Sequence, residues 1–489
     1  MAILYFLFLS LLFLIPVWYN LPYDFILIIK EMVVYMVKLQ FKIKNNKYIS
    51  LEPTKIIVFS FLAVIFCGAF LLNLPIASNP GQPPVNFLTA LFTATSATCV
   101  TGLGVVDIAT QWSGFGRMVI ILLVQIGGLG LVTITTFFSV LLGKKVGIKG
   151  QILAQESLNH FSSVGVLKLI KRVISITFFI EFIGAVILSI KFIPRYGLRG
   201  IYLSFFHSIS AFCNAGINFI DNYQSLTNFK NDPFVLLTTS SLIVIGGLGF
   251  LVWKDIYEFR KNKQFFVHTK VVLVSTTILL VFGTLSIFIF EHNNPYTLGN
   301  LSIPGKLLNS YFHSVSLRTA GFYSFPISGM YEITRVISIL LMFIGASPGS
   351  TGGGIKVTTF AIIIAAIYSH TRGRDDTIVF KHKIPYNLVF KALTIIGLSF
   401  IIVITVTTLV LAIDGFPFID TLYEITAAFS TVGISPIGTS NLHTVSKIAI
   451  IITMFIGRVG PLTFALSLSL RGGRKNEDLI YPEAKIVVG

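Results

Sequence analysis

Phe92-TATSATCVT-Gly102 is a short stretch that begins with an aromatic residue, ends in one glycine and precedes a long apolar run. The chain repeats this cassette as Phe206-HSISAFCNA-Gly216, Phe312-HSVSLRTA-Gly321 and Tyr423-EITAAFSTV-Gly433. The aromatic residue and the glycine are 10, 10, 9 and 10 positions apart. Four copies of one cassette in an apolar chain predict four structural units around a common axis, and an axis lined by four glycine turns is a pore.

A second glycine follows each cassette at a similar distance. The next apolar run contains an Ile-Gly step whose glycine lies 25, 30, 24 and 24 positions after the cassette glycine. One such residue would indicate only close packing, because glycine is frequent in membrane helices. Four matched pairs indicate a repeated unit. The steps are Ile126-Gly127, Ile245-Gly246, Ile344-Gly345 and Ile456-Gly457.

The composition is that of a membrane protein. Of the 489 residues, 54% are hydrophobic and 12% are charged, and the mean hydropathy is +0.84. A soluble domain does not need so much apolar surface, so the bilayer is the expected solvent. The cysteines lack CxxC spacing and the histidines lack HExxH spacing, which argues against a zinc site or a disulfide framework. No acid–base pair or nucleophile constellation stands out, so the sequence does not predict an enzyme.

The net charge of +17 reflects membrane topology, and no nucleic-acid partner is predicted. Of the Lys and Arg residues between the predicted spans, 23 lie in loops on one side and 9 in loops on the other. The positive-inside rule assigns the first side to the cytoplasm and all four cassettes to the outer side. The eight predicted spans are 56–74, 118–142, 173–192, 234–253, 271–290, 334–368, 386–412 and 446–470.

We therefore expect an all-α integral membrane fold of four pseudo-symmetric helix–pore-loop–helix repeats around one central pore. Two interpretations of the first 40 residues stay open: two extra helices, the second of them a weak span or an interfacial helix, or a signal peptide without a basic n-region or an evident cleavage site. The predicted parts are an N-terminal extension at 1–54, repeats at 55–150, 168–260, 270–368 and 386–475, and a C-terminal tail at 476–489.

The chemistry of the cassettes suits a dehydrated cation. An ion that crosses the bilayer exchanges its hydration shell for oxygen ligands, and rings of backbone carbonyls supply them without fixed anions in the membrane. The unusual dihedrals of such a turn need a residue without Cβ, which explains one glycine per cassette. The apolar segment before each glycine suits a half-length helix, whose C-terminal end would direct partial negative charge at the axis.

The residue after each Ile-Gly step forms a second constellation, namely Gly128, Gly247, Ala346 and Arg458. Around an axis, three small residues leave room for one guanidinium beneath the cassette turns. A permanent charge at membrane depth costs about 2.5–3.5 kcal/mol on insertion scales and is functional by default. We expect Arg458 to repel permeating cations and to help close the path; the alternative is an arginine that caps carbonyls of a broken helix.

A Gly/Ser-rich loop interrupts the second helix of repeat three. Residues 345–354 contain five glycines, which leave no helical propensity. Irregular backbone at membrane depth is tolerated where it lines a cavity or is buried in protein, so we expect a gate in the inner pore, with a static kink as the alternative. Lys356 is expected to pair with this loop or with a cytoplasmic partner. The predicted gate residues are Arg458, Gly349, Ser350, Thr351, Gly352, Gly353, Gly354 and Lys356.

From about residue 55 to residue 489 the chain resembles the Trk/Ktr/HKT superfamily of potassium transporters. The run Ser347-PGSTGGGI-Lys356 resembles the intramembrane loop of that family, and Ile456-GRVGPL-Thr463 with Tyr481-PEA-Lys485 is most similar to the KtrB family of Ktr membrane subunits. Residues 1–54 depart from the short Ktr amino terminus and resemble the extra helix pair of the Trk branch. By this resemblance the selectivity filter is Val100, Thr101, Gly102, Asn214, Ala215, Gly216, Thr319, Ala320, Gly321, Thr431, Val432 and Gly433.

The resemblance implies uptake of K⁺ across the plasma membrane, with K⁺ held at the filter carbonyls, Na⁺ as a candidate activator and no cofactor in this chain. In the plant branch a serine in place of the first filter glycine accompanies sodium transport, so Gly102 implies potassium selectivity. A homodimer on a cytosolic nucleotide-binding regulatory ring is the implied assembly. The alternatives are a Trk-type sodium-permeable or proton-coupled cation carrier and, outside transport, a membrane assembly or anchoring protein.

Overall fold

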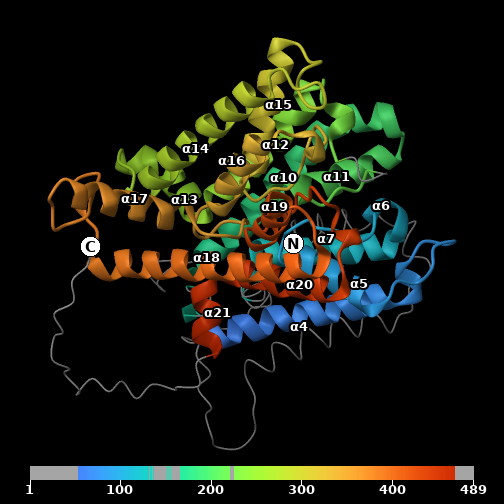
Figure 1. The fold of residues 1–489 in the computed structure, drawn as a ribbon, viewed down its shortest axis with the longest axis horizontal. Helices are drawn as coiled ribbons and strands as arrows, with labels where there is room; N and C mark the ends of the chain where they lie inside the picture. Colours follow the sequence, from blue (N-terminus) through green and yellow to red (C-terminus); the bar gives the residue numbers. More distant parts are fainter. Residues whose placement is uncertain are drawn as a thin grey trace, which may run out of the picture.

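The computed structural model of the chain describes residues 53–130, 166–220 and 225–468, together with 133, 134, 136, 151, 152 and 155. The predictions for the extension at 1–54 fall almost entirely outside the described residues, and those for the tail at 476–489 fall wholly outside them. Helices make up nearly all of the regular structure, as expected for an all-α membrane protein (Figure 1).

Each repeat begins with one long apolar helix. These four helices are the described helices that are by themselves long and apolar enough to cross a membrane. They overlap the predicted first spans, and α10 and α14 begin several residues before the predicted starts. The helices are α4 (Pro53–Asn73), α10 (Val166–Tyr196), α14 (Val267–Glu291) and α18 (Tyr386–Asp414).

A short, largely buried helix follows each long one and ends at a cassette turn. Two of these helices start with a side-chain cap: Asn86 Oδ1 accepts from Thr89 N at 2.8 Å, and Ser302 Oγ accepts from Gly305 N at 3.4 Å. Their lengths of 12 to 14 residues make them half-length pore helices. They are α5 (Phe87–Thr98), α11 (Arg199–Phe212), α15 (Ile303–Ser316) and α19 (Phe418–Phe429).

The second helix is broken in repeats two, three and four, and the prediction of continuous second spans in repeats two and four was wrong. The breaks fall at Gly249, with a bend of 92°, and at Gly460, with a bend of 101°. Both glycines have positive φ, +92° and +97°, which a side chain rarely adopts. The pieces are α12 (Pro233–Leu248) with α13 (Phe250–Asn262), and α20 (Thr444–Val459) with α21 (Pro461–Leu468).

Repeats one and three follow the same plan. In repeat one α7 (Gly114–Leu129) ends at Gly130, whose φ is +82°. In repeat three α16 (Glu332–Phe343) and α17 (Val357–Thr371) are separated by the expected Gly/Ser loop. Counting each bent pair as one span gives six spans in the described part of the chain, whereas α7 and α17 are shorter apolar helices. Some of the eight predicted crossings are therefore inner helices that are interrupted at a glycine.

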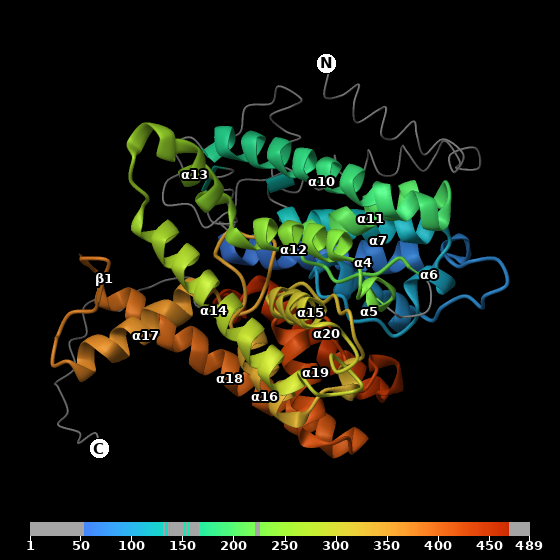
Figure 2. The ribbon, with the colours of Figure 1, turned by 90° about the horizontal axis from the view of Figure 1, so that it is seen from above.

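Short elements complete the loops. The strands form an antiparallel hairpin that pairs Ile378 with Lys383 and Val379 with His382. This hairpin and α6 lie at opposite ends of the molecule (Figure 2), which separates the predicted cytoplasmic loops from the cassette side. The short elements are η1 (Pro75–Ala77), α6 (Ile108–Gln111), η2 (Thr227–Phe229), η3 (Ile327–Gly329), β1 (Ile378–Val379), β2 (His382–Lys383) and η4 (Thr439–Asn441).

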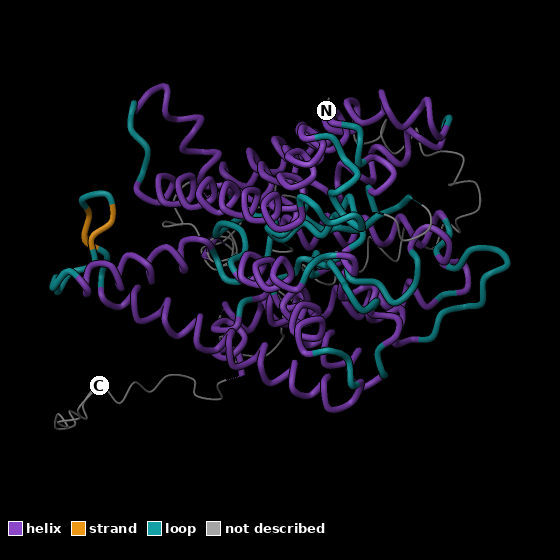
Figure 3. Tube along the Cα trace, turned by 45° about the horizontal axis from the view of Figure 1, so that its top comes forward, coloured by secondary structure: helices purple, strands orange, loops and turns teal. Residues whose placement is uncertain are grey.

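The four repeats form a closed ring. The inner helix of each repeat packs on the pore helix of the next: α7 on α11, α12 on α15, α16 on α19, and α20 back on α5. In Figure 1 the last repeat, in red, accordingly lies beside the first, in blue. Figure 3 shows loop segments gathered between the helices in the middle of the molecule. The predicted fold of four repeats around one axis is confirmed by this arrangement.

Candidate functional site

The four cassette turns share one backbone conformation. In each turn the last residue is a glycine with positive φ, and the residue two positions earlier is a non-glycine residue that also has positive φ. Such a residue is uncommon outside glycine, so its recurrence at one register in all four repeats indicates a constrained functional turn. The φ values are 59° and 92° for Val100 and Gly102, 59° and 63° for Asn214 and Gly216, 67° and 81° for Thr319 and Gly321, and 54° and 87° for Thr431 and Gly433.

The turns meet in chain order around a ring. A Cβ on each glycine would collide with the carbonyl oxygen of the middle residue in the next turn: Gly216 with Ala320 O at 2.7 Å, and Gly102 with Ala215 O in the same manner. Gly321 approaches Val432 O, and Gly433 closes the circle on Thr101 O. These contacts bring together all four glycines that the sequence singled out. The ring leaves no room for a side chain at any of them.

Each turn is anchored to the end of its own pore helix. The amide of the middle residue donates to a carbonyl in the last helical turn, as in Thr101 N to Ser96 O and Ala215 N to Ser210 O, both at 2.8 Å. In the second repeat Ser210 Oγ also donates to Ile217 O beyond the glycine, at 2.8 Å. The turns are therefore held by short local bonds, and the negative ends of four helix dipoles lie behind them.

The glycines of the Ile-Gly steps allow the inner helices to approach the pore helices. A Cβ on Gly127 would collide with Thr98 O. Gly246 and Gly457 make the equivalent approach to Phe212 O and to Phe429 O. Each acceptor lies four residues before the filter glycine of its repeat. The Ile-Gly glycines thus bring the inner wall against the base of each turn.

Repeat three differs at this step because the Gly/Ser loop replaces the helix end. A Cβ on Gly345 would meet Gly353 O, a residue of the loop itself. The loop lies directly beneath the ring: a Cβ on Gly352 would collide with Thr319 Oγ1, and Gly353 N donates to Thr431 Oγ1 at 3.1 Å. The loop therefore contacts the cassette turns of repeats three and four.

Backbone bonds also tie the loop to the inner helices of repeats two and four. Ser347 N donates to Gly247 O at 3.1 Å, and Thr351 N donates to Gly246 O at 3.3 Å. Gly354 N donates to Gly457 O at 3.3 Å. Irregular backbone at this depth is thus paired with protein groups, which is the condition under which a bilayer protein tolerates it.

Two cations hold the loop carbonyls. The Arg458 guanidinium donates to Thr351 O through Nη1, and to Gly127 O and Gly128 O through Nη2, the last at 3.3 Å. Lys356 Nζ donates to Gly352 O at 2.7 Å. Arg458 therefore caps the carbonyls at the end of α7, as the alternative interpretation holds, and at the same time joins α20 to the loop of repeat three.

Arg318 lies behind the third turn, one residue before the filter residue Thr319. Its side chain is 7% exposed, and Nη2 donates to Gly345 O at 2.7 Å. This bond links the turn to the start of the Gly/Ser loop, so the third turn and the loop share one support.

Sequence reasoning missed a further glycine, three residues after the Ile-Gly glycine, in repeats one, two and four. Gly130, Gly249 and Gly460 all lie three residues after the Ile-Gly glycine and have positive φ. The signal was present in the printed sequence as Ile126-GGL-Gly130, Ile245-GGL-Gly249 and Ile456-GRV-Gly460. In repeats two and four it marks the bend of the inner helix.

The outer side carries two hollows. An open one of about 370 Å³ is lined in part by Tyr323, Pro326 and Ser435, which follow the third and fourth turns. Burial, and after it the Asp107 carboxylate, raise the pKa of Tyr323, so the phenol at this mouth stays neutral at physiological pH.

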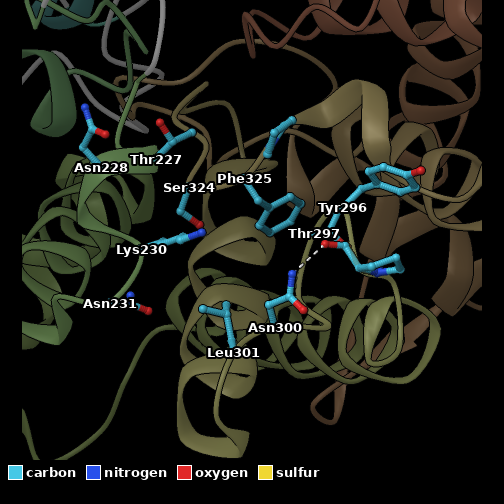
Figure 4. Close-up of a pocket in the computed structure, with 12 residues that line it drawn as sticks. Thr227, Asn228, Lys230, Asn231, Tyr296, Thr297, Asn300, Leu301, Ser324 and Phe325 are labelled. Atoms are coloured by element: carbon cyan, nitrogen blue, oxygen red, sulfur yellow. Dashed lines mark hydrogen bonds between the residues drawn. The ribbon is translucent and has the colours of Figure 1, made fainter.

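The other outer hollow, of about 400 Å³, is shown in Figure 4. Lys230 and Asn228 lie on one side of it, and Asn300 and Leu301 lie on another. It contains none of the predicted filter or gate residues.

The described residues contain no group of three His, Cys, Asp or Glu side chains that could hold a metal ion. The oxygen atoms that the ring brings together belong to the backbone and to threonine side chains. Such ligands suit an alkali cation that passes through, as in a carbonyl filter.

Comparison with known proteins gives one consistent family. A family model described as "Cation transport protein", TrkH, matches residues 27–473. The Ktr system potassium uptake protein B of Bacillus subtilis (strain 168) is 41% identical over 92% of this chain and 99% of its own length. The potassium/sodium uptake protein NtpJ of Enterococcus hirae is 36% identical over 90% of this chain and 98% of its own length.

A solved structure shares the fold. The crystal structure of the potassium transporter TrkH from Vibrio parahaemolyticus superposes with a TM-score of 0.70 over 89% of this chain and 88% of that one. The sequence identity is 16%, so this likeness concerns the fold. The resemblance inferred from the sequence is confirmed by the relatives together with this fold.

Proposed function

The chain belongs to the TrkH family of cation transport proteins, and we propose that it takes up K⁺ through a filter formed by its four cassette turns. It is an integral protein of the plasma membrane and a transporter, not an enzyme. Potassium is the ion named for the relative that is 41% identical.

The closed ring of glycine contacts is the observation that carries the proposal. Each turn abuts a carbonyl oxygen of the next, so the twelve backbone positions of the four turns form one continuous lining. Main-chain oxygens in such a lining replace water around K⁺, while four helix C-termini stabilise its charge. The filter residues are Val100, Thr101, Gly102, Asn214, Ala215, Gly216, Thr319, Ala320, Gly321, Thr431, Val432 and Gly433.

The gate of the proposed path is the loop beneath the filter. Below the turns, Arg458 donates to Thr351 O and Lys356 donates to Gly352 O. The residues of this loop are Gly349, Ser350, Thr351, Gly352, Gly353 and Gly354. A guanidinium at this depth repels a cation that leaves the filter, because little water is present to screen it. To open the proposed path, the hydrogen bond from Arg458 to Thr351 O must break and the loop must move aside.

The proposed assembly rests on the resemblance to Ktr membrane subunits. We infer that two copies of the chain associate and that a cytosolic nucleotide-binding ring controls the loop through the predicted basic cytoplasmic segments. The chain itself has no recognisable nucleotide-hydrolysing motif, so energy coupling or gating comes from the membrane potential or from a partner. Na⁺ is a candidate activator, since one relative is named for potassium and sodium uptake.

Flux through reconstituted vesicles tests the proposal. Purified protein in vesicles should take up ⁸⁶Rb⁺ or K⁺ when a negative internal potential is imposed, and excess K⁺ should compete better than Na⁺. Equal competition by Na⁺ would favour the alternative of a sodium-permeable carrier. Uptake that drives proton movement and persists without a membrane potential would favour a proton-coupled one.

A further inference from the structure

A buried carboxyl group lies behind the filter in the middle of a membrane helix. Glu181, in α10, is 3% exposed. It belongs neither to the filter nor to the gate. An ionisable residue inside a spanning helix is expensive and usually faces a specific partner. The two side chains that contact it show what that partner is.

The carboxyl group joins the inner helix of repeat one to the second filter turn. Gln125 Nε2, in α7, donates to Glu181 Oε1 at 3.1 Å. Cys213 Sγ lies 3.8 Å from Glu181 Oε1 and 3.8 Å from Gln125 Oε1, within reach of a weak thiol hydrogen bond. Ser208 Oγ donates to the backbone oxygen of Glu181 at 2.6 Å, which fixes α11 to α10 at the same level.

Cys213 is directly coupled to the filter. It is fully buried, it caps the C-terminus of α11, and the next residue is Asn214, the first filter residue, with φ +59°. On its other side the thiol is tightly packed, because a Cβ on Gly128 would lie 2.7 Å from Cys213 Sγ. The thiol is therefore packed between Gly128 and the Glu181–Gln125 pair. The carbonyl of Gly128 accepts from Arg458.

This support is specific to the second repeat. The residues that precede the four turns are Cys99, Cys213, Arg318 and Ser430. Of these four, Cys213 is the one whose side chain contacts a carboxyl group within the described part of the chain, whereas Arg318 binds a backbone carbonyl. The ring is closed, so a shift of the second turn also changes its contacts with Gly102 and with Ala320.

We propose that Glu181 is a positioning residue for ion selectivity: through Cys213 it fixes the second filter turn against the inner helix of repeat one. The required property is a polar oxygen at Oε1 that accepts from Gln125 and from the thiol. Glutamine keeps that oxygen and leucine removes it. The proposal rests on the potassium filter proposed above and adds a side chain that never contacts the ion.

The test measures competition of K⁺ and Na⁺ for binding to purified full-length protein, by titration calorimetry. Glu181→Leu should reduce the K⁺ over Na⁺ preference by about fivefold, the change that loss of one hydrogen bond of about 1 kcal/mol produces in an equilibrium. Glu181→Gln should retain the wild-type preference. A purely structural role would lower the yield or the thermal stability of both variants without moving the ratio.

Glu291→Leu is the matched control. Glu291 is also fully buried, but it accepts from Asn294, Thr297 and Tyr331 N in the outer loops of repeat three. Its loss should destabilise the protein and leave ion preference unchanged. An equal loss of preference in Glu291→Leu would overturn the proposal, because selectivity would then respond to any buried carboxyl.

A second variant keeps the proposal testable if Glu181→Leu does not fold. Cys213→Ala should reproduce the loss of preference, Cys213→Ser should preserve it, and Cys213→Ala combined with Glu181→Gln should match Cys213→Ala alone. Unchanged preference in both Cys213→Ala and Glu181→Leu, with normal preference in the wild type, would refute the inference alone. A wild type without preference for K⁺ would refute the proposed function instead.

Discussion

The carbonyl oxygen of Thr101 occupies the position into which a side chain on Gly433 would project. These residues belong to the first and last repeats, so their contact closes the ring of the four cassette turns. A ring formed in this way cannot adjust one turn independently of its neighbours, because a side chain on any filter glycine displaces a backbone group of the next turn. The four predictions below concern this ring, the bonds beneath it and an ion pair at the outer side.

Gly102→Ser should lower the preference for K⁺ over Na⁺ by on the order of tenfold. The residue has φ +92°, and the new Cβ would collide with Ala215 O. A left-handed conformation alone costs about 1–2 kcal/mol for a side-chain residue. Competition of unlabelled K⁺ and Na⁺ against ⁸⁶Rb⁺ uptake in vesicles measures the effect.

Gly81→Ser is the control that separates backbone strain from the collision with Ala215 O in the Gly102→Ser experiment. Gly81 has φ +89°, close to that of Gly102, but no atom lies within 4 Å of an added Cβ. This variant should carry similar backbone strain and unchanged ion preference. If Gly102→Ser also keeps the wild-type preference, the filter assignment of the first turn is wrong.

Arg458→Ala should increase K⁺ flux in the absence of any cytosolic partner. The change removes the bonds to Thr351 O and to Gly127 O, and with them the positive charge below the filter. Arg458→Lys should give an intermediate flux, because one ammonium keeps the charge but cannot span carbonyls on two elements as the guanidinium fork does. Initial rates of ⁸⁶Rb⁺ uptake provide the comparison, and wild-type rates in both variants would assign Arg458 to helix capping alone.

Asp420→Asn should destabilise the fold by about 1.5–3 kcal/mol, the range for a hydrogen bond to a charged group. Asp420 pairs with Arg335, and this bond joins the pore helix of repeat four to the inner helix of repeat three at the outer side. The exposed pair of Asp376 and Lys383 is the control, since surface pairs contribute about 0–1 kcal/mol. Thermal unfolding in detergent should therefore show a loss for Asp420→Asn and almost none for Asp376→Asn.

K⁺ should raise the unfolding temperature of the purified protein more than Na⁺ at equal ionic strength. A ligand that binds only the folded state stabilises it by about 2.7 kcal/mol at a concentration 100-fold above its dissociation constant. Choline chloride serves as the control for ionic strength. Equal shifts with all three salts would indicate that the ring does not bind K⁺ selectively.

The register of the cassettes was readable without coordinates. An aromatic residue and a glycine at nearly constant distance predicted one turn per repeat, and each predicted glycine lies in the ring. Arg458 was likewise conspicuous, because it is the one charged residue among four positions that are otherwise small. Both signals come from comparing the four repeats with one another, and this comparison needs no knowledge of which residues are in contact.

The breaks in the inner helices of repeats two and four were not predicted, although Gly249 and Gly460 are visible in the sequence. Mean hydropathy continues across both residues, and a glycine inside an apolar run is compatible with a straight membrane helix. At Gly249 the bend accompanies a close tertiary contact, since an added Cβ would lie 2.7 Å from Pro348 O. That neighbour comes from the loop of another repeat.

The sequence by itself determined that four equivalent turns exist, that each needs a residue without a side chain, and that one arginine, Arg458, follows the fourth Ile-Gly step. These are properties of composition and spacing. Only the tertiary structure decided which carbonyl meets which glycine, that the ring runs in chain order, and that Glu181 reaches the second turn through Cys213. The physical reason is that these relations depend on distances between residues far apart in the chain, which close packing fixes and local sequence does not encode.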